Sequence, residues 1–250
     1  MDLALAAFAL APGLVFGSFL NVVAARVPLR RSVVSPPSAC MSCGTQIAWY
    51  DNVPVLSWLV LRGRCRSCSA AIPARYPAVE LVSALLVAGS VWKFGLHSEA
   101  LVAAFFCLAL VAVSATDIEH GIIPNRIVLP AAAVVLAAQT ALRPSPQWAI
   151  GALAASGFLF AAALLSRGMG MGDVKLALLL GAMLGKTVSV ALLLGMFAAF
   201  VPAIYLLLRH GAAARKTKLP FGPFLAIGAV IALFWGPQLL SRYWSLFHLH

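Results

Sequence analysis

Long apolar runs separated by short polar segments occupy most of this sequence. Eight runs can be traced, at Leu3–Val27, Pro77–Val91, Ala100–Thr116, Ile122–Leu142, Trp148–Leu165, Val174–Gly185, Thr187–Leu208 and Phe221–Leu240. Apolar runs of roughly 20 residues are typical of helices that cross a membrane. The pattern therefore predicts an all-α polytopic membrane protein with about eight transmembrane helices.

The sixth run, Val174–Gly185, is shorter than a usual span. Its 12 residues would form a helix of about 18 Å, against a hydrocarbon core of about 30 Å. Joining this run to the next would bury Lys186 in the middle of the membrane, so we expect two separate helices. The short helix would leave Asp173, just before it, in a recess below the membrane surface.

Composition and charge support the same interpretation. The chain is 62% hydrophobic and 10% charged, whereas soluble domains carry about 25% charged residues. With the N-terminus outside, 14 of the 18 basic residues fall on the cytosolic side and 4 on the other, as the positive-inside rule requires. The net charge of +11 is then explained by basic residues kept in cytosolic loops. It does not indicate nucleic-acid binding, because no basic stripe interleaved with aromatics is present.

The first run follows an acidic Asp2 and lacks a basic region before it, so we expect a retained span and not a cleaved signal.

One long polar insert interrupts the pattern after the first run. We expect three parts: a first transmembrane helix at 1–27, a cytosolic four-cysteine domain at 28–76, and a multi-span membrane domain at 77–250.

The insert contains Cys40, Cys43, Cys65 and Cys68, in the spacing C-x2-C-x21-C-x2-C. Each C-x2-C pair can offer two thiolates to one tetrahedral zinc ion. A loop of about 50 residues buries little core, so a metal staple makes physical sense. Two disulfides or a redox-active pair are alternatives, but a reducing cytosol disfavours the disulfides. Cys107 lies in an apolar run and is expected to pack there.

Two aspartates lie at the cytosolic ends of spans. Asp117 ends the third run, and Asp173 opens the sixth within Gly170-Met171-Gly172-Asp173-Val174-Lys175. Carboxylates at membrane depth are costly and indicate function. Two carboxyls that share a proton can activate water with one member and protonate the carbonyl or the leaving amine with the other. Taken singly, Asp173 could be a helix N-cap and Asp117 a polar span end that reaches toward water.

The order of these motifs resembles that of the bacterial type IV prepilin peptidases, the bifunctional leader peptidases and N-methyltransferases of type IV pili and type II secretion. The similarity covers nearly the whole chain. Besides the cysteines and aspartates, it rests on the segments Phe16–Val23, Trp49–Trp58, Leu61–Arg66 and Arg75–Glu80. An ordered set of this kind is far more specific than a lone G-x-G-D.

The resemblance implies that Asp117 and Asp173 form the catalytic pair, with Gly170, Gly172 and Lys175 in the active-site loop. It implies structural zinc in the cytosolic domain and methyl transfer from S-adenosylmethionine, although no glycine-rich fingerprint indicates where this donor binds. The implied substrates are prepilin and pseudopilin precursors, met in the bacterial inner membrane with the zinc domain and active site toward the cytosol.

Two further acids are candidates for contact with the basic leader of such a precursor. Glu119 follows Asp117 by two residues, and Glu80 begins the second run. Glu119 could instead be a solvated loop residue, and Glu80 could pair with Arg75. Other functions compatible with membrane acids are a proton-coupled carrier, a related peptidase for preflagellin or signal-peptide remnants, and a structural membrane protein. A carrier would leave the cysteine domain unexplained, and the two halves show no repeat.

Overall fold

The computed structural model of this chain describes residues 3–166, 170–211 and 219–247. Asp2 and four basic residues used for the expected orientation lie outside these ranges: Arg167, Arg215, Lys216 and Lys218. Within the described ranges the elements are helices and turns, with two isolated β-bridges in the polar insert. The expected all-α class is confirmed.

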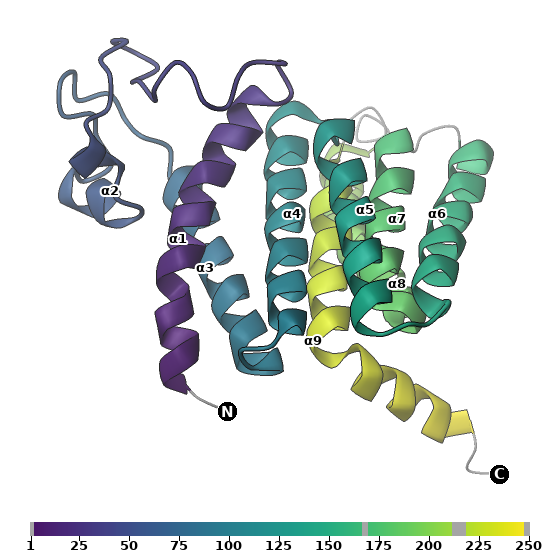
Figure 1. The fold of residues 1–250 in the computed structure, drawn as a ribbon. Coiled ribbons are helices and arrows are strands. Elements are labelled where there is room, and N and C mark those ends of the chain that lie inside the picture. Colours follow the sequence, from purple (N-terminus) through teal and green to yellow (C-terminus); the bar gives the residue numbers. More distant parts are fainter. Residues whose placement is uncertain (1–2, 167–169, 212–218, 248–250) are drawn as a thin grey trace. The chain divides into compact units, whose positions relative to one another are not determined.

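Eight of the helices are apolar and follow one another along the chain. They are α1 (Leu3–Arg26), α3 (Arg75–Phe94), α4 (Ser98–His120), α5 (Asn125–Leu142), α6 (Gln147–Ser166), α7 (Met171–Leu184), α8 (Val188–His210) and α9 (Gly222–Phe247) (Figure 1). Among the described residues, seven apolar stretches are long enough to span a membrane, with α7 and α8 together counted as one stretch. The protein is therefore a multi-pass membrane protein.

The expected break after the short sixth span is present. A 3₁₀ turn at Gly185–Thr187 separates α7 from α8, and α7 has 14 residues, or about 21 Å of helix. The helix begins at Met171 and not at Val174. Asp173 therefore lies in the first turn of α7, and the residue that caps the helix is Gly170.

The chain forms two compact units, residues 1–115 and 116–250. The N-terminal unit holds α1, α3 and most of α4. It also holds the cysteine loop, as we call residues 27–74, with a 3₁₀ turn at Trp49–Asn52 and the short helix α2 (Leu56–Val60). The C-terminal unit holds the last turn of α4 and helices α5 to α9.

Helices α1 and α3 lie side by side in the N-terminal unit (Figure 1). A Cβ atom on Gly13 would lie 2.5 Å from the Cα of Ala84, and one on Gly17 would lie 2.6 Å from the Cα of Glu80. Real side chains do not tolerate such distances, so the two glycines permit the close approach, as in other small-xxx-small contacts of membrane helices. The approach brings Ser18 of α1 beside Glu80 of α3.

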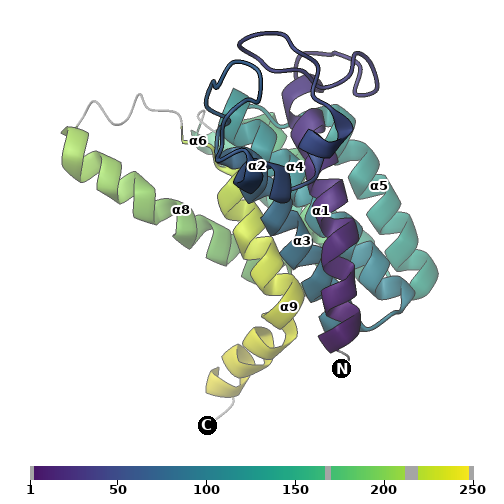
Figure 2. The same cartoon turned by 90° about the vertical axis from the view of Figure 1, so that its left-hand side faces the viewer.

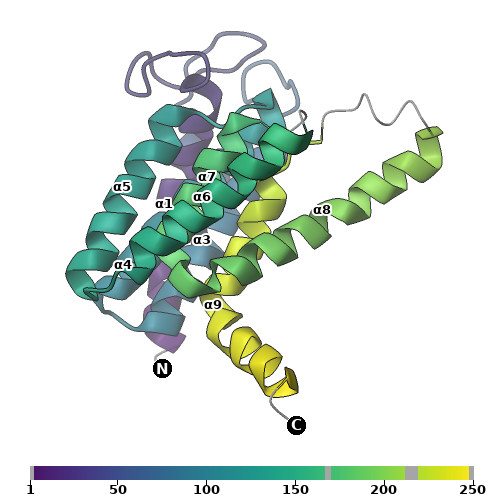
Figure 3. The ribbon, with the colours of Figure 1, turned by 90° about the vertical axis from the view of Figure 1, so that its right-hand side faces the viewer.

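Helix α7 lies at the centre of the C-terminal unit and packs against α5, α6 and α9. Leu176, Ala177, Leu179 and Leu180 are fully buried there. Figure 3 shows α6 lying against α7, where the absent side chain of Gly181 lets the two backbones meet. The first half of α8 packs against α9, and its second half diverges from it (Figure 2).

Candidate active site and metal centre

Asp117 lies one turn before the end of α4, and its side chain is buried. Its Oδ2 accepts a 2.9 Å hydrogen bond from the backbone N–H of Gly222, the first residue of α9. The first N–H groups of a helix lack a partner within that helix, and the Asp117 carboxylate satisfies one of them. Asp117 is thus held inside the protein and does not reach out toward water.

Gly222 is close to Asp117 because it has no side chain. A Cβ atom at this position would lie 2.8 Å from Oδ2 of Asp117 and 3.4 Å from Cγ. Pro223 follows within the first turn of α9, where proline is favoured because its ring presets the backbone angle and no N–H is needed. The start of α9 is therefore built as a rigid contact with the carboxylate.

Asp173 is the third residue of α7, after the extended backbone of Gly170. Its carboxyl is partly buried and is close enough to Asp117 for the two charges to repel. The N-terminus of a helix favours a negative charge nearby. Two carboxyls from helices far apart in sequence are thus brought together within the C-terminal unit.

Two contacts join the segments that carry these aspartates. Lys175 Nζ donates to Oδ1 of Asn125 at 2.9 Å. Gly172 packs on Ile123, because a Cβ atom added to this glycine would lie only 2.9 Å from the Cβ of Ile123. The predicted active-site loop of Gly170, Gly172 and Lys175 therefore adjoins the segment after Asp117.

Two residues near Asp117 escaped the sequence reasoning. Gly222 is one, and His120, one helical turn after Asp117, is the other. The Nε2 atom of His120 is buried without a hydrogen-bond partner among the described residues. Its spacing of three from Asp117 places both on one helix face, which is the signal that could have found it. Glu119, between them, is exposed, which a contact with a leader peptide requires.

Glu80 belongs to the N-terminal unit, where its carboxyl is buried. It accepts the backbone N–H of Val55 at 2.7 Å and hydrogen-bonds with Ser18. Val55 has φ 61°, which is unusual for a β-branched residue. Glu80 thus joins the cysteine loop to α3 through a strained backbone position.

The first C-x2-C pair forms a tight knuckle. The N–H of Cys40 donates to the carbonyl of Thr45, and the N–H of Gly44 donates to the carbonyl of Cys40, both at 2.9 Å. Ala39 and Gln46 close the knuckle as an antiparallel bridge. Gly44 adopts φ 72°, which glycine does without strain.

The second pair repeats this geometry. Cys65 donates to the carbonyl of Ala70 and accepts from Ser69, again at 2.9 Å, and Arg64 and Ala71 form the matching bridge. Ser69 takes the position of Gly44, with φ 57°. The two knuckles therefore have the same backbone geometry, and their four cysteine sulfur atoms lie close together.

The four sulfur atoms lie within 4.8 Å of one another, and none is in a disulfide. Cys40 and Cys68 are 3.8 Å apart, Sγ to Sγ. Tetrahedral thiolates at about 2.3 Å from zinc would be about 3.8 Å apart, so the site fits such an ion.

At Cys40 and Cys65, backbone N–H groups favour the thiolate form that metal binding needs. Those of Cys43 and Ser42 lower the pKa of the Cys40 thiol. The N–H of Cys68 does the same for the pKa of Cys65. The four predicted cysteines are thus gathered in a site that could hold a metal ion.

Comparison with known proteins places both features in one family. Residues 12–94 match the Bacterial Peptidase A24 N-terminal domain, and residues 104–207 match the Type IV leader peptidase family. Proteins named prepilin leader peptidase/N-methyltransferase from Bacillus subtilis, Burkholderia pseudomallei and Pseudomonas aeruginosa are each 37% identical over 92% of this chain. The match covers 94%, 85% and 90% of those proteins, respectively. The chain matches no solved structure. With these similarities spanning both the cysteine loop and the aspartates, the chain belongs to the type IV leader peptidase family.

Proposed function

We propose that this protein is a membrane aspartyl endopeptidase that removes the basic leader from type IV prepilins and pseudopilins and N-methylates the new N-terminal residue. The observation that carries the peptidase half is the pairing of Asp117 with Asp173 in one unit, close enough for their charges to interact. The relatives' name, prepilin leader peptidase/N-methyltransferase, supports the substrate and the second activity.

In the proposed reaction, the two carboxyls share one proton and act on a water molecule. The ionised member takes a proton from water as the oxygen bonds to the scissile carbonyl carbon. The protonated member then gives its proton to the leaving nitrogen as the C–N bond breaks. Oδ2 of Asp117 already accepts the Gly222 N–H, so Oδ1 is the oxygen available to water or proton. Lys175 contacts Asn125, and Gly172 packs on Ile123. These contacts hold the start of α7, and with it the Asp173 carboxyl, against the segment that follows Asp117.

A membrane location suits this substrate class, because a precursor that carries an apolar helix is itself held in the bilayer. We place the protein in the bacterial inner membrane, with the cysteine loop and active site toward the cytosol, as the distribution of basic residues indicates. The short α7 sets Asp173 below the membrane surface, where a cleavage site next to an apolar helix would lie. The division into 1–27, 28–76 and 77–250 remains part of this proposal.

In the second half of the proposal, Cys40, Cys43, Cys65 and Cys68 hold a zinc ion that stabilises the cysteine loop. S-adenosylmethionine supplies an electrophilic methyl group on a sulfonium for transfer to the new amine. Glu119 meets basic side chains of the leader from its exposed position beside Asp117.

The test is to incubate the purified protein with a prepilin in detergent, with and without S-adenosylmethionine, and to measure product mass. We expect loss of the leader in both samples, and one added methyl group only with the donor. An intact precursor would contradict the peptidase assignment. Proton flux in vesicles without cleavage would favour the carrier alternative.

A further inference from the structure

A cavity of about 530 Å³ opens in the N-terminal unit between the cysteine loop and the adjoining ends of α1 and α3. Its wall includes Ser18, Asn21 and Val22 of α1, Trp58 of α2, and Glu80 of α3. Pockets of about 300–1,000 Å³ bury most of a drug-sized molecule. The volume therefore suits a ligand of nucleoside size.

Glu80 supplies a buried carboxyl group to this cavity. Burying a carboxylate is costly unless its oxygens are hydrogen-bonded. The two bonds with Val55 and Ser18 leave part of its acceptor capacity unused, because a carboxylate offers about four lone-pair sites. A ligand that brings hydroxyl groups or a positive charge would complete the set.

The other walls are fixed by contacts within the unit. Asn21 donates from Nδ2 to the carbonyl of Tyr76 at 3.1 Å, which leaves its Oδ1 as an acceptor. The indole N–H of Trp58 donates to the carbonyl of Ile72 at 3.0 Å. Gly63 lies against the Trp58 ring, because a Cβ atom on this glycine would lie 2.9 Å from Cζ2 of the ring. The rest of the ring is a flat apolar surface suited to a base.

Positive side chains complete the lining. Arg26 and Arg75 border the cavity, where either could meet a carboxylate. The combination of a buried acid, an amide, an indole and arginines is complementary to a nucleoside that carries an amino-acid tail and a cationic centre. S-adenosylmethionine has these parts: an adenine, a ribose with two hydroxyls, a sulfonium, an ammonium and a carboxylate.

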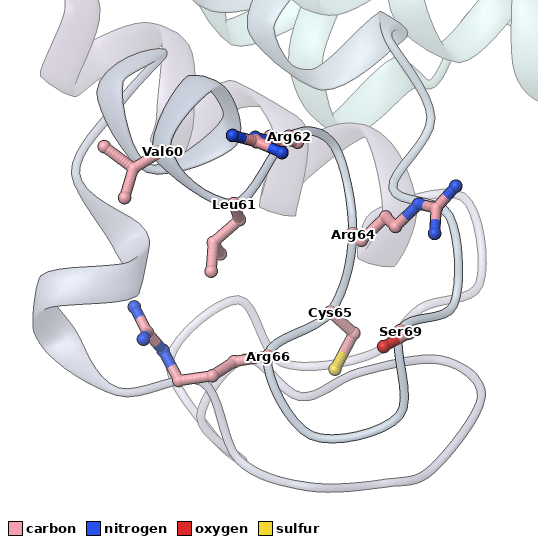
Figure 4. Close-up of a pocket in the computed structure, with 7 residues that line it drawn as sticks. All are labelled: Val60, Leu61, Arg62, Arg64, Cys65, Arg66 and Ser69. Carbon is pink, nitrogen blue, oxygen red and sulfur yellow. The ribbon is translucent and has the colours of Figure 1, made fainter.

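A second hollow, of about 590 Å³, shares Leu61, Cys65 and Arg66 with the cavity. It is bordered by exposed arginines, and Arg64 extends away from Leu61 (Figure 4). No buried polar side chain lines it. The chemistry of a nucleoside-derived cation therefore favours the cavity beside Glu80.

Building on the methyltransferase half of the proposed function, we infer that this cavity binds the methyl donor, with the Glu80 carboxylate contacting the ribose hydroxyls or the cationic end. The cysteine loop forms one wall, and Glu80 ties that loop to α3 through Val55. Cys40 and Cys65 of the cysteine cluster also line the cavity, so the cluster borders the donor site. A role for Glu80 in leader binding would instead affect cleavage.

The first measurement is direct binding of S-adenosylhomocysteine, the unreactive product, to the full-length protein by calorimetry. Glu80→Gln keeps an oxygen for the Val55 N–H but removes the charge. We expect its affinity to fall on the order of tenfold to a hundredfold, the range for losing a hydrogen bond to a charged group. Val22→Phe, which adds bulk from α1 and leaves Glu80 intact, should also weaken binding. Glu99→Gln, the same chemical change at the start of α4 outside the cavity, is the matched control.

The second measurement maps the site. Ultraviolet cross-linking of S-adenosyl-[methyl-³H]methionine to the wild type should label peptides within residues 18–80. In turnover, the methylated fraction of cleaved pilin should fall for Glu80→Gln at low donor concentration and recover at high concentration. Unchanged affinity in both cavity variants, or label only in residues 116–250, would overturn the assignment of the donor site. If the wild type still methylated the cleaved pilin, the proposed function would stand. A wild type that neither binds nor transfers would overturn both.

Discussion

Replacing Gly222 with alanine tests whether the start of α9 positions Asp117. The added Cβ would lie 2.8 Å from Oδ2 and 3.5 Å from Cβ of Asp117. Separations under 3.0 Å do not occur for real Cβ atoms, so the carboxylate or the helix end must move by a few tenths of an ångström or more. The movement would stretch the 2.9 Å hydrogen bond from the Gly222 N–H.

A displaced catalytic group can cost about a hundredfold in rate. Losing a hydrogen bond to a carboxylate costs about 1.5–3 kcal/mol. We therefore expect kcat for prepilin cleavage to fall about tenfold to a hundredfold, with KM little changed, because Gly222 holds a reacting group and need not touch the substrate. Alanine favours helix formation over glycine by about 1 kcal/mol, so weaker helix formation would not explain the loss.

The assay is cleavage of a purified prepilin followed by mass spectrometry, with thermal unfolding measured in parallel. Gly157→Ala in α6 is the control, because a Cβ there would meet nothing within 4 Å. In an Asp117→Asn background, Gly222→Ala should cause no further loss of cleavage, since the two changes act through one carboxyl. Wild-type kcat for Gly222→Ala would refute the positioning argument.

Three more outcomes are expected. Lys175→Met, which removes the donor to Asn125, should slow cleavage about twofold to tenfold, the range for one hydrogen bond. Asn125→Ala should cause the same loss, and a double variant with an additive loss would contradict the shared contact. Elemental analysis should find one zinc ion per chain, and Cys65→Ser should lose it and harm methylation more than cleavage; a metal-free, folded and fully active protein would rule out the staple. Glu119→Gln should weaken binding of basic-leader precursors about twofold to fivefold at low salt, as for an exposed charge pair, with the difference vanishing at high salt. Identical binding by the variant and the wild type at low salt would remove Glu119 from the substrate path.

The sequence predicted the features that depend on local pattern. Apolar runs gave the helices because each span needs a continuous apolar length, and Lys186 correctly indicated the break between α7 and α8. The spacing of Cys40 to Cys68 predicted the cluster because each knuckle is closed by residues next to it in the chain.

Contacts made by backbone atoms between distant segments could not be predicted. Gly222 lies 105 residues from Asp117, and its N–H leaves no side-chain signal. The same holds for Val55, whose N–H binds Glu80, and for the cavity that this bond helps to form. The apolar run at Val174 begins three residues after the true start of α7 at Met171, because the polar Asp173 lies inside the first turn and Gly170 is the residue that caps the helix.

The most direct test of the central claim is prepilin cleavage by Asp117→Asn and Asp173→Asn, each purified and checked for its helical content and metal. If the two carboxyls form one catalytic pair, each variant should lose cleavage by several orders of magnitude, and the double variant should be no worse than either alone. Full cleavage by either single variant would contradict the claim.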